Sequence, residues 1–275
     1  MWPEHPAPCE LTGLADEVVW LESTESTNSH AARLPASAGS RVVASWNQTA
    51  GVGRMGRTWV SPPGRSLALS VELGPQLTPA DLSADVSADV SAVLSSQWRG
   101  LLPLLVGTHL AHALGGVVPG VGVKWPNDVQ IGGDKVAGIL GEIVPPGRVI
   151  VGVGINVALT RDELPTESAT SLLLHGLHHR GSTAEDAFAG ALREFLAGLT
   201  GSLAQARDGI PAPLWSMVRG ALSTIGKRVR VSFPDGHDIT GVAEDLDSQG
   251  RLIVRTETGG TEVIAAADIE HLRPA

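Results

Sequence analysis

The stretch that most constrains the fold is residues 48–59, which read Gln-Thr-Ala-Gly-Val-Gly-Arg-Met-Gly-Arg-Thr-Trp. Apolar residues alternate on both sides of it, which predicts one strand over residues 41–46 and another over residues 67–73. The stretch is therefore a loop between two strands, and its glycines leave the backbone free to approach a ligand closely. It lacks the Gly-Lys-Ser/Thr end of a P-loop, and no strand–helix–strand unit follows as a dinucleotide-binding fold would require.

Two arginines of this loop, Arg54 and Arg57, indicate an anion as the ligand. The guanidinium group carries a permanent charge and a planar set of donors that fits a carboxylate or a phosphate. A glycine-rich loop with such charges is suited to fold over an anionic ligand. The residues are equally compatible with an exposed turn and solvated arginines, because short motifs often occur by chance.

Composition narrows the classes of function. The chain has 275 residues with 43% hydrophobic content, enough for one sizeable domain and a smaller one. Its formal net charge of −9 argues against general nucleic-acid binding, which relies on Lys and Arg to neutralise phosphate. The single cysteine, Cys9, excludes an internal disulfide and fits a reducing compartment. The sequence shows no signal-peptide pattern and no apolar run of membrane-spanning length, so we expect a cytoplasmic protein.

Ser26, Thr27 and Asn28 stand at the start of a predicted helix that continues through Ala31 and Leu34. Such side chains commonly cap a helix by accepting hydrogen bonds from its first N–H groups. They can also present hydroxyls and an amide to a small polar ligand beside the helix. On these residues alone, both roles stay open.

Polar residues also stand at the ends of the central strands. A Trp-Pro-Asn-Asp turn at 125–128 supplies oxygens suited to a ligand amide or a hydrated Mg²⁺, although Pro-Asn-Asp is also ordinary turn chemistry. Lys135 begins a long apolar strand predicted over residues 135–144. Asn156 lies near the end of a strand at 149–157, whose alternating glycines predict that another group packs closely on one face. A buried Asn there must be hydrogen-bonded, either by the backbone or by a ligand.

The rest of the chain divides into three regions. Residues 1–17 are rich in proline and predict a loose tail. Residues 18–220 form the larger predicted domain. From residue 221 the pattern changes to short alternating strands and turns, which predicts a small barrel over residues 221–275.

Within the larger domain, Ser182 and Glu185 form a predicted capping box at the start of a helix with a clean apolar stripe. A short repeat inside residues 74–98 predicts a variable surface insertion or a short exposed helix. His109 and His112 lie one helical turn apart on a buried helix predicted over residues 101–114. Without nearby acidic or cysteine ligands, they predict packing in preference to a metal pair.

Five motifs taken together resemble those of the biotin protein ligases. They are Glu-Ser-Thr-Asn at 25–28, the loop at 48–59, Lys-Trp-Pro-Asn-Asp at 124–128, Lys-Val-Ala-Gly-Ile-Leu at 135–140 and Gly-Val-Gly-Ile-Asn at 152–156. Their order and rough spacing match, and the resemblance covers residues 18–272. It implies an α+β protein, with a class II synthetase-like catalytic domain built on a mixed sheet and a C-terminal SH3-like barrel.

The resemblance also implies an ATP-dependent ligase that works in two steps. Biotin and ATP give biotinyl-5′-AMP and pyrophosphate, and the biotinyl group then passes to one lysine of a biotin carboxyl carrier domain of a biotin-dependent carboxylase. Mg²⁺ would enter with ATP, near Asp128, and would not be held by the protein alone. Since the Ser-Thr-Asn motif begins at residue 26, we expect no N-terminal DNA-binding domain. The acidic charge and the lack of a membrane-spanning run predict no nucleic-acid or membrane partner, and a homodimer is left open.

Individual roles follow from the same resemblance. Lys135 and Arg54 would be catalytic, because positive charge offsets the repulsion between the biotin carboxylate and the α-phosphate. The residues implied for biotin are Ser26, Thr27, Asn28, Gln48, Gly51, Gly53, Arg54 and Lys135. Those implied for ATP and the adenylate are Arg57, Trp59, Lys124, Asn127, Asp128 and Asn156.

One position departs from the family pattern. The loop in relatives usually reads Gly-Arg-Gly-Arg, whereas residue 52 here is Val, so one cation is missing. Two alternatives therefore stand beside biotin ligation. A lipoate-type acyl-protein ligase shares the fold and the acyl-adenylate chemistry, although the Trp-Pro-Asn-Asp and Lys-Val-Ala-Gly-Ile-Leu motifs favour biotin. A non-catalytic biotin-binding protein is the other alternative, and Val52 is the reason to consider it.

Overall fold

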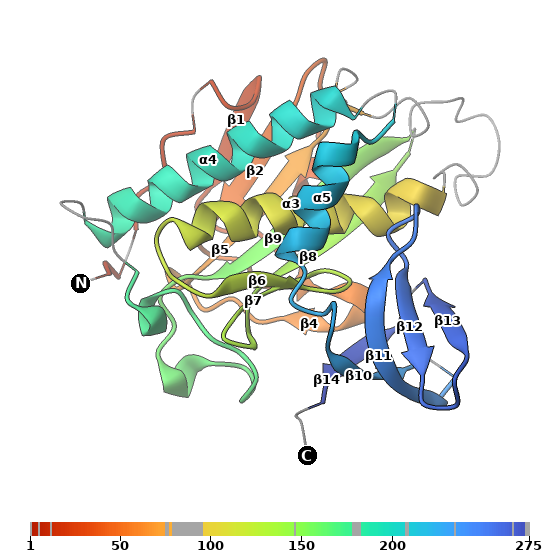
Figure 1. Cartoon of the computed structure of the whole chain (residues 1–275). Coiled ribbons are helices and arrows are strands. Elements are labelled where there is room, and N and C mark those ends of the chain that lie inside the picture. Colours follow the sequence, from red (N-terminus) through yellow and green to blue (C-terminus); the bar gives the residue numbers. More distant parts are fainter. Residues whose placement is uncertain are drawn as a thin grey trace.

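The computed structural model describes residues 2–4, 6–11, 13–74, 77–78, 96–145, 147–177, 183–206, 209–233, 235–265 and 267–272. Its centre is a seven-stranded sheet in the order β1-β2-β5-β9-β8-β7-β6 (Figure 1). The strands are β1 (Glu17–Leu21), β2 (Arg41–Ser45), β5 (Ser66–Glu72), β9 (Arg148–Asn156), β8 (Asp134–Val144), β7 (Asp128–Ile131) and β6 (Val121–Lys124). The β1–β2 pair is parallel and the other neighbours are antiparallel, so the sheet is mixed as expected.

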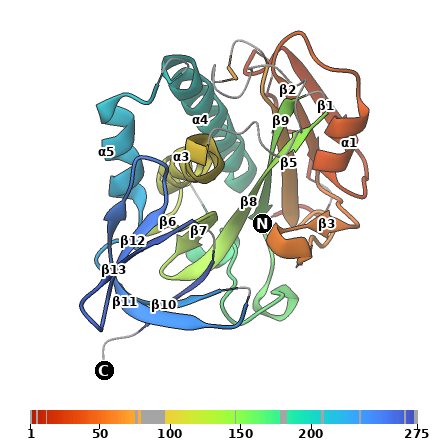
Figure 2. The same cartoon turned by 90° about the vertical axis from the view of Figure 1, so that its right-hand side faces the viewer.

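Helices cover the two faces of this sheet unequally (Figure 2). The helices α3 (Ser96–Gly115), α4 (Ala184–Gln205) and α5 (Ala212–Ala221) lie on one face, and the short α1 (Thr27–Arg33) lies on the other. The described residues also include three short 3-10 helices: η1 (Arg54–Gly56), η2 (Arg161–Glu163) and η3 (Leu173–His175). No helix in the described ranges is long and apolar enough to cross a membrane.

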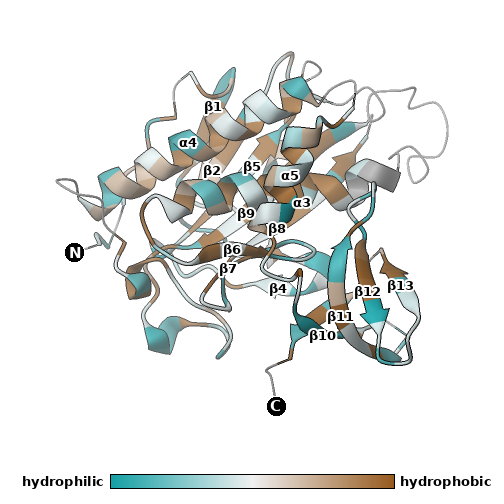
Figure 3. Cartoon of the chain, viewed as in Figure 1, coloured by the Kyte–Doolittle hydropathy of each residue, from teal (hydrophilic) through white to brown (hydrophobic). Residues whose placement is uncertain are grey.

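The alternation of residue sizes in β5 and β9 explains this asymmetry. On the α3 side the two strands present large apolar residues, which are buried in the core: Leu67, Leu69, Val71, Val151, Val153 and Ile155. On the α1 side they present small ones, and the register pairs Ser70 with Gly152 and Ala68 with Gly154. Apolar colouring is accordingly concentrated on the sheet and its covering helices in Figure 3. The small residues leave room above the sheet beside α1.

A second, five-stranded antiparallel sheet forms the C-terminal part, in the order β13-β12-β11-β10-β14. Its strands are β10 (Arg228–Ser232), β11 (Asp238–Leu246), β12 (Leu252–Thr256), β13 (Thr261–Ile264) and β14 (Asp268–His271). Trp125 joins it to the larger domain, because the indole Nε1 donates to the carbonyl of Gly250 at 2.9 Å and the backbone N–H donates to Thr224 Oγ1 at 3.0 Å. The predicted α+β class and small C-terminal β domain are confirmed.

The N-terminal segment differs from the expected loose tail. Trp2 is 5% exposed, its indole Nε1 donates to the carbonyl of Gly64 at 3.0 Å, and its ring lies edge-on to Trp46 and Phe188 at 5.6 and 5.9 Å. Leu11 is also buried. Burial of the large Trp2 ring stabilises the folded position of this proline-rich segment and anchors it to the core.

Two local predictions need comment. The capping box of α4 lies one residue later than predicted, since Thr183 caps the helix and Asp186 returns the hydrogen bond. His109 packs as expected, with Nε2 at 2.8 Å from Ser202 Oγ, and burial lowers its pKa to about 4. The repeat at residues 82–91 lies outside the described residues, and so does Ser182.

Candidate functional site

The glycine loop folds as a small hairpin over the α1 side of the sheet. Strands β3 (Gly51–Val52) and β4 (Thr58–Trp59) pair antiparallel, and η1 connects them. Met55 in the connection has a left-handed backbone with φ of 56°. A Cβ on Gly51 would lie 2.6 Å from the carbonyl oxygen of Trp59, so only glycine allows the hairpin to close here.

A cavity of about 510 Å³ lies between this hairpin, α1, the Trp-Pro-Asn-Asp turn and strands β5, β8 and β9. The structure brings together at this cavity nearly all the residues that the sequence singled out: Ser26, Thr27, Asn28, Gln48, Gly53, Arg54, Arg57, Trp59, Lys124, Asn127, Asp128, Lys135 and Asn156. Gly51 alone of the predicted set does not line it, because Gly51 is buried within strand β3 of the hairpin. Asp268 and Ile269 of β14 also line the cavity, so the C-terminal part contributes to it.

One end of the cavity is lined by uncharged amide and hydroxyl groups from α1 and Gln48. The Ser26 side chain caps α1 by accepting from the N–H of Ser29 at 3.4 Å, so the capping role is real and coexists with a place on the cavity wall. Gln48 Oε1 accepts from the backbone N–H of Thr27 at 2.9 Å. Asn28 is 6% exposed, and its Nδ2 donates to the carboxylate of Glu142 at 2.6 Å. These side chains are held by hydrogen bonds within the protein before any ligand arrives.

Two residues of this end escaped the sequence analysis. Ser70 is fully buried, with Oγ at 2.7 Å from Thr27 Oγ1 and 2.6 Å from Asn28 Oδ1. Glu142 lies on β8 and binds Asn28. Neither residue belongs to a recognisable motif. Each is a polar residue within a mostly apolar strand, Ser70 in β5 and Glu142 in β8, and both face α1. This interruption of the apolar pattern is the signal that could have identified them.

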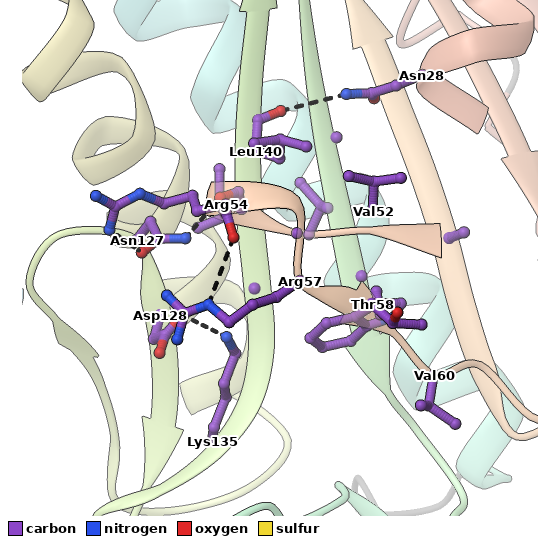
Figure 4. A pocket seen from close by; sticks show the side chains of 18 of the residues that line it. Asn28, Val52, Arg54, Arg57, Thr58, Val60, Asn127, Asp128, Lys135 and Leu140 are labelled. Carbon is purple, nitrogen blue, oxygen red and sulfur yellow. Dashed lines mark hydrogen bonds and ion pairs between the residues drawn. The ribbon is translucent and has the colours of Figure 1, made fainter. Parts of the chain in front are cut away.

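The other end of the cavity is cationic. Arg54 Nη1 donates to Asn127 Oδ1 at 3.1 Å, and Lys135 Nζ lies 2.6 Å from Asp128 Oδ1. Arg57 Nη2 donates to Asp268 Oδ1 at 2.8 Å, which ties the hairpin to β14. Figure 4 shows Arg54, Arg57, Asp128 and Lys135 grouped together, with Asn28 well apart from them.

Burial makes these cations sensitive to what binds beside them. Burial lowers the pKa of the Arg54 guanidinium from its ordinary value, and Arg57 adds to this effect while Asp268 and Asp128 oppose it. Burial likewise lowers the pKa of Lys124, with Asp128 as the main opposing charge. A cation that has lost part of its hydration gains more from a bound anion than an exposed cation does.

Trp59 covers the floor of the cavity between the two ends. A Cβ on Gly154 would lie 2.4 Å from Cε2 of the indole, and one on Gly138 would lie 3.1 Å from Cζ3. The predicted close packing on the glycine face of β9 is therefore confirmed, and Trp59 is the group that packs there. Lys135 Nζ stands 5.5 Å from the ring centroid. The buried Nε1 of Trp59 has no hydrogen-bond partner among the residues that the structure describes.

The sequence left open whether Asn156 is hydrogen-bonded by the backbone or by a ligand, and the structure shows a backbone partner. Its Nδ2 donates to the backbone carbonyl of Thr170 at 3.1 Å, and the residue is 2% exposed. The side chain is thus oriented by the backbone at the edge of the cavity. Within the described part of the chain, no three His, Cys, Asp or Glu residues come together as a metal site would require.

Comparison with known proteins agrees with this arrangement. The model of the Biotin/lipoate A/B protein ligase family matches residues 20–159, and that of the Biotin protein ligase C terminal domain matches residues 224–272. The chain is 30% identical to the Biotin--[acetyl-CoA-carboxylase] ligase of Paracoccus denitrificans, with 90% of this chain and 98% of the relative covered. This chain belongs to the biotin protein ligase family. It is also 37% identical to the ligase of the same name from Mycobacterium tuberculosis, over 82% of this chain and 77% of the relative.

Solved structures show the same fold for a biotin protein ligase. The chain matches the biotin protein ligase from Aquifex aeolicus in complex with biotin and ATP with a TM-score of 0.70, at 24% identity, covering 94% of this chain and 100% of that one. The family expected from the five motifs is therefore confirmed. The match of the C-terminal residues to a biotin protein ligase domain favours biotin over lipoate as the acyl group.

Proposed function

We propose that this chain condenses biotin with ATP to form biotinyl-5′-AMP and pyrophosphate, and then transfers the biotinyl group to a lysine of a carrier domain. The observation that carries the proposal is the polarity of the cavity. One end offers amide and hydroxyl groups beside the carboxylate of Glu142, and the other end offers Arg54, Lys124 and Lys135. Biotin has the matching polarity, because a neutral ureido ring and a carboxylate stand at its two ends.

At the amide end, ligand recognition would rest on Ser26, Thr27, Asn28 and Gln48. Ureido N–H and C=O groups need partners of this kind, and a site built to hydrogen-bond a buried ligand group rejects analogues that lack it. The small residues of β5 and β9 would accept the apolar body of biotin, with Trp59 beside it.

At the cationic end, Lys135 and Arg54 would act on the first step. The biotin carboxylate oxygen attacks the α-phosphorus of ATP, an O–P bond forms, and pyrophosphate leaves. Two anions must approach each other, and charge accumulates on the transferred phosphoryl group. Fixed positive charge at that place offsets the repulsion and stabilises the transition state.

ATP and its metal would occupy the part of the cavity near the Trp-Pro-Asn-Asp turn. The residues there fit Mg²⁺, which is commonly bound through one or two carboxylates together with the phosphates of the substrate. Asp128 would supply the carboxylate and Asn127 an amide oxygen, and the metal would neutralise phosphate charge. Arg57, Lys124 and Asn156 would line the nucleotide, and Trp59 would cover the adenine.

The second step needs only an incoming amine. The ε-amino group of the carrier lysine attacks the carbonyl carbon of biotinyl-5′-AMP, an amide bond forms, AMP leaves, and the amine loses a proton. The named relatives point to the biotin carboxyl carrier domain of acetyl-CoA carboxylase as the partner. A homodimer stays a prediction, which sedimentation of the pure chain would test.

The decisive experiment measures pyrophosphate release with ATP and Mg²⁺ in the presence of biotin, lipoate or neither, followed by transfer to a biotin carboxyl carrier domain. We expect release with biotin only, and a streptavidin-reactive carrier. Release with lipoate would favour the lipoate-type ligase. Biotin binding without any release would favour the non-catalytic alternative.

A further inference from the structure

A continuous chain of hydrogen bonds runs under the amide end of the cavity from Thr27 to Glu142. Ser70 Oγ lies 2.7 Å from Thr27 Oγ1 and 2.6 Å from Asn28 Oδ1, and Asn28 Nδ2 donates to Glu142 Oε2 at 2.6 Å. Thr27, Asn28 and Ser70 are 3%, 6% and 0% exposed, so water has little access to their polar atoms. Thr27, Asn28 and Ser70 therefore hydrogen-bond to one another, and Asn28 also binds Glu142.

The charge of Glu142 decides the direction of every hydrogen in this chain. An ionised carboxylate only accepts hydrogen bonds, so Asn28 must turn its Nδ2 toward Glu142, and the carbonyl of Leu140 at 3.4 Å also accepts from this amide. Asn28 Oδ1 then faces Ser70 and must accept. Ser70 has one hydroxyl hydrogen, and it is used there.

The same reasoning assigns the direction of the hydrogen bond made by the Thr27 hydroxyl. Because Ser70 gives its one hydrogen to Asn28, we assign the hydrogen in the 2.7 Å contact between the two hydroxyls to Thr27, so that Thr27 donates and Ser70 accepts. The longer 3.3 Å contact between Thr27 Oγ1 and Gln48 Oε1 is left without one. Thr27 thus keeps only lone pairs to offer to a ligand in the cavity, which it lines.

Gln48 complements this arrangement. Its Oε1 accepts from the backbone N–H of Thr27 at 2.9 Å, which leaves Nε2 without a partner in the described part of the chain. The wall of the cavity therefore presents an acceptor at Thr27 beside a donor at Gln48. A ligand group that satisfies both carries an N–H next to a C=O, as a urea or an amide does.

We propose that Ser70 and Glu142 are positioning residues that fix Thr27 as a hydrogen-bond acceptor, and so select ligands with a ureido or amide N–H at this end of the cavity. The inference rests on the proposed function and deepens it, since the ureido ring of biotin is such a group. Neither Ser70 nor Glu142 needs to touch the ligand for this effect.

The test is a double-mutant cycle on the dissociation constant of biotin, measured by calorimetry without ATP. Glu142→Gln keeps the size of the side chain but offers both a donor and an acceptor, so Asn28 is free to turn over and the order of the hydrogens is lost. Ser70→Ala breaks the chain in the middle. Each variant is expected to raise the dissociation constant about tenfold, near the upper end of the range for a hydrogen bond between neutral groups.

The double variant separates a chain from two independent contacts. Without the Ser70 hydroxyl, Glu142 can no longer orient the hydroxyl of Thr27. Adding Glu142→Gln to Ser70→Ala should therefore cause little further loss of biotin affinity. We expect the double variant to bind about tenfold more weakly than the parent protein, and not about a hundredfold. Multiplicative losses would overturn the proposal.

Two further measurements separate positioning from general damage. Turnover at saturating biotin and the KM for ATP should stay at parent values in Glu142→Gln, because the cationic end is untouched. Glu257→Gln is the matched control, since it removes another exposed carboxylate, on the far sheet, that pairs with Arg228. If Ser70→Ala fails to fold, Glu142→Gln decides the question alone, because Glu142 is exposed.

The outcomes are distinct from those of the proposed function. Parent protein that does not bind biotin contradicts the proposed function. Parent protein that binds biotin, with Glu142→Gln binding equally well, contradicts the positioning role and leaves ligation intact.

Discussion

The two ends of the cavity are held in place in different ways. At the amide end, Thr27, Asn28 and Ser70 are nearly inaccessible to solvent and are fixed by hydrogen bonds inside the protein. At the cationic end, the side chains of Lys135 and Asp128 are 34% and 23% exposed, and those of Arg57 and Asp268 are 59% and 50% exposed. The first end is preorganised for its ligand, whereas at the second end Lys135 and Arg57 are paired with carboxylates that a bound anion can replace.

This contrast explains how one cavity can serve both binding and reaction. Preorganised donors and acceptors give selectivity, because they do not reorganise when the ligand arrives. Exchangeable ion pairs keep the cations in place without competing strongly, since a partly exposed pair contributes little to stability. Changes at the first end should therefore alter affinity for biotin, and changes at the second should alter the rate of adenylate formation.

The largest effect is expected from Lys135→Ala. Removing this ammonium takes away positive charge where two anions meet, so the rate of biotinyl-AMP formation should fall by about 10²–10³-fold. Biotin-dependent pyrophosphate release measures it. Lys227→Ala is the control, because Lys227 is an exposed lysine of the C-terminal part. A rate near that of the parent protein would mean that Lys135 does not act on the reacting groups.

Gln48→Ala should have the next largest effect, and on affinity. The change removes a donor from the cavity wall and leaves the buried N–H of Thr27 without its acceptor. The dissociation constant of biotin should rise about 10- to 100-fold while the KM for ATP stays constant. Asn47→Ala, at the neighbouring position, is the control. An equal loss of affinity for biotin and for ATP would contradict the assignment of separate roles to the two ends of the cavity.

Val52→Arg should tighten biotin binding about tenfold, because it adds a charge-assisted contact to an anionic ligand. Val52 is 52% exposed and lines the cavity, so a longer side chain has room there. The parent protein should also leak more biotinyl-AMP, seen as biotin transferred to albumin. Met55→Arg adds the same charge to the same hairpin at a residue that is 61% exposed and does not line the cavity. If both variants behave like the parent, Arg54 and Lys135 already saturate the site.

The smallest effect concerns closure of the hairpin. Biotin with ATP should slow trypsin cleavage at Arg54 and Arg57, because ordered loops resist proteolysis. Asp268→Asn removes the ion pair with Arg57, and cleavage in the free protein should rise only several-fold, as expected for an exposed pair worth about 0–1 kcal/mol. Equal cleavage with and without ligands would count against closure.

Much of this molecule was predictable from local sequence. Apolar alternation predicted β2 and β5, and longer apolar runs predicted β8 and β9, because residues of all four strands are buried in the core. The glycines at 152 and 154 predicted close packing, and the structure shows Asn28 and Trp59 there. Five motifs in order then identified the family and nearly all of the cavity wall.

What escaped prediction depends on contacts between distant segments. Ser70 is 42 residues from Asn28, and Asp268 is 211 residues from Arg57, so only the packing of α1 on β5 and of the hairpin on β14 brings these pairs together. Trp2 was assigned to a loose tail because the prediction rested on the proline content of residues 1–17. No sequence pattern shows that a single aromatic residue there packs into the core. The capping box moved by one residue because Ser182 and Thr183 are both good caps, with an acidic residue three positions after each.

The place of Trp59 has a consequence for how this protein can be observed. Its indole lies on the glycine floor of the cavity, within 5.5 Å of the Lys135 ammonium, whereas Trp2, Trp46, Trp98 and Trp125 are buried in the core. Indole emission shifts with the polarity and charge around the ring. A ligand that draws Lys135 away, or that covers the ring, therefore changes the fluorescence of the unlabelled protein, and the filling of the cavity becomes an optical signal.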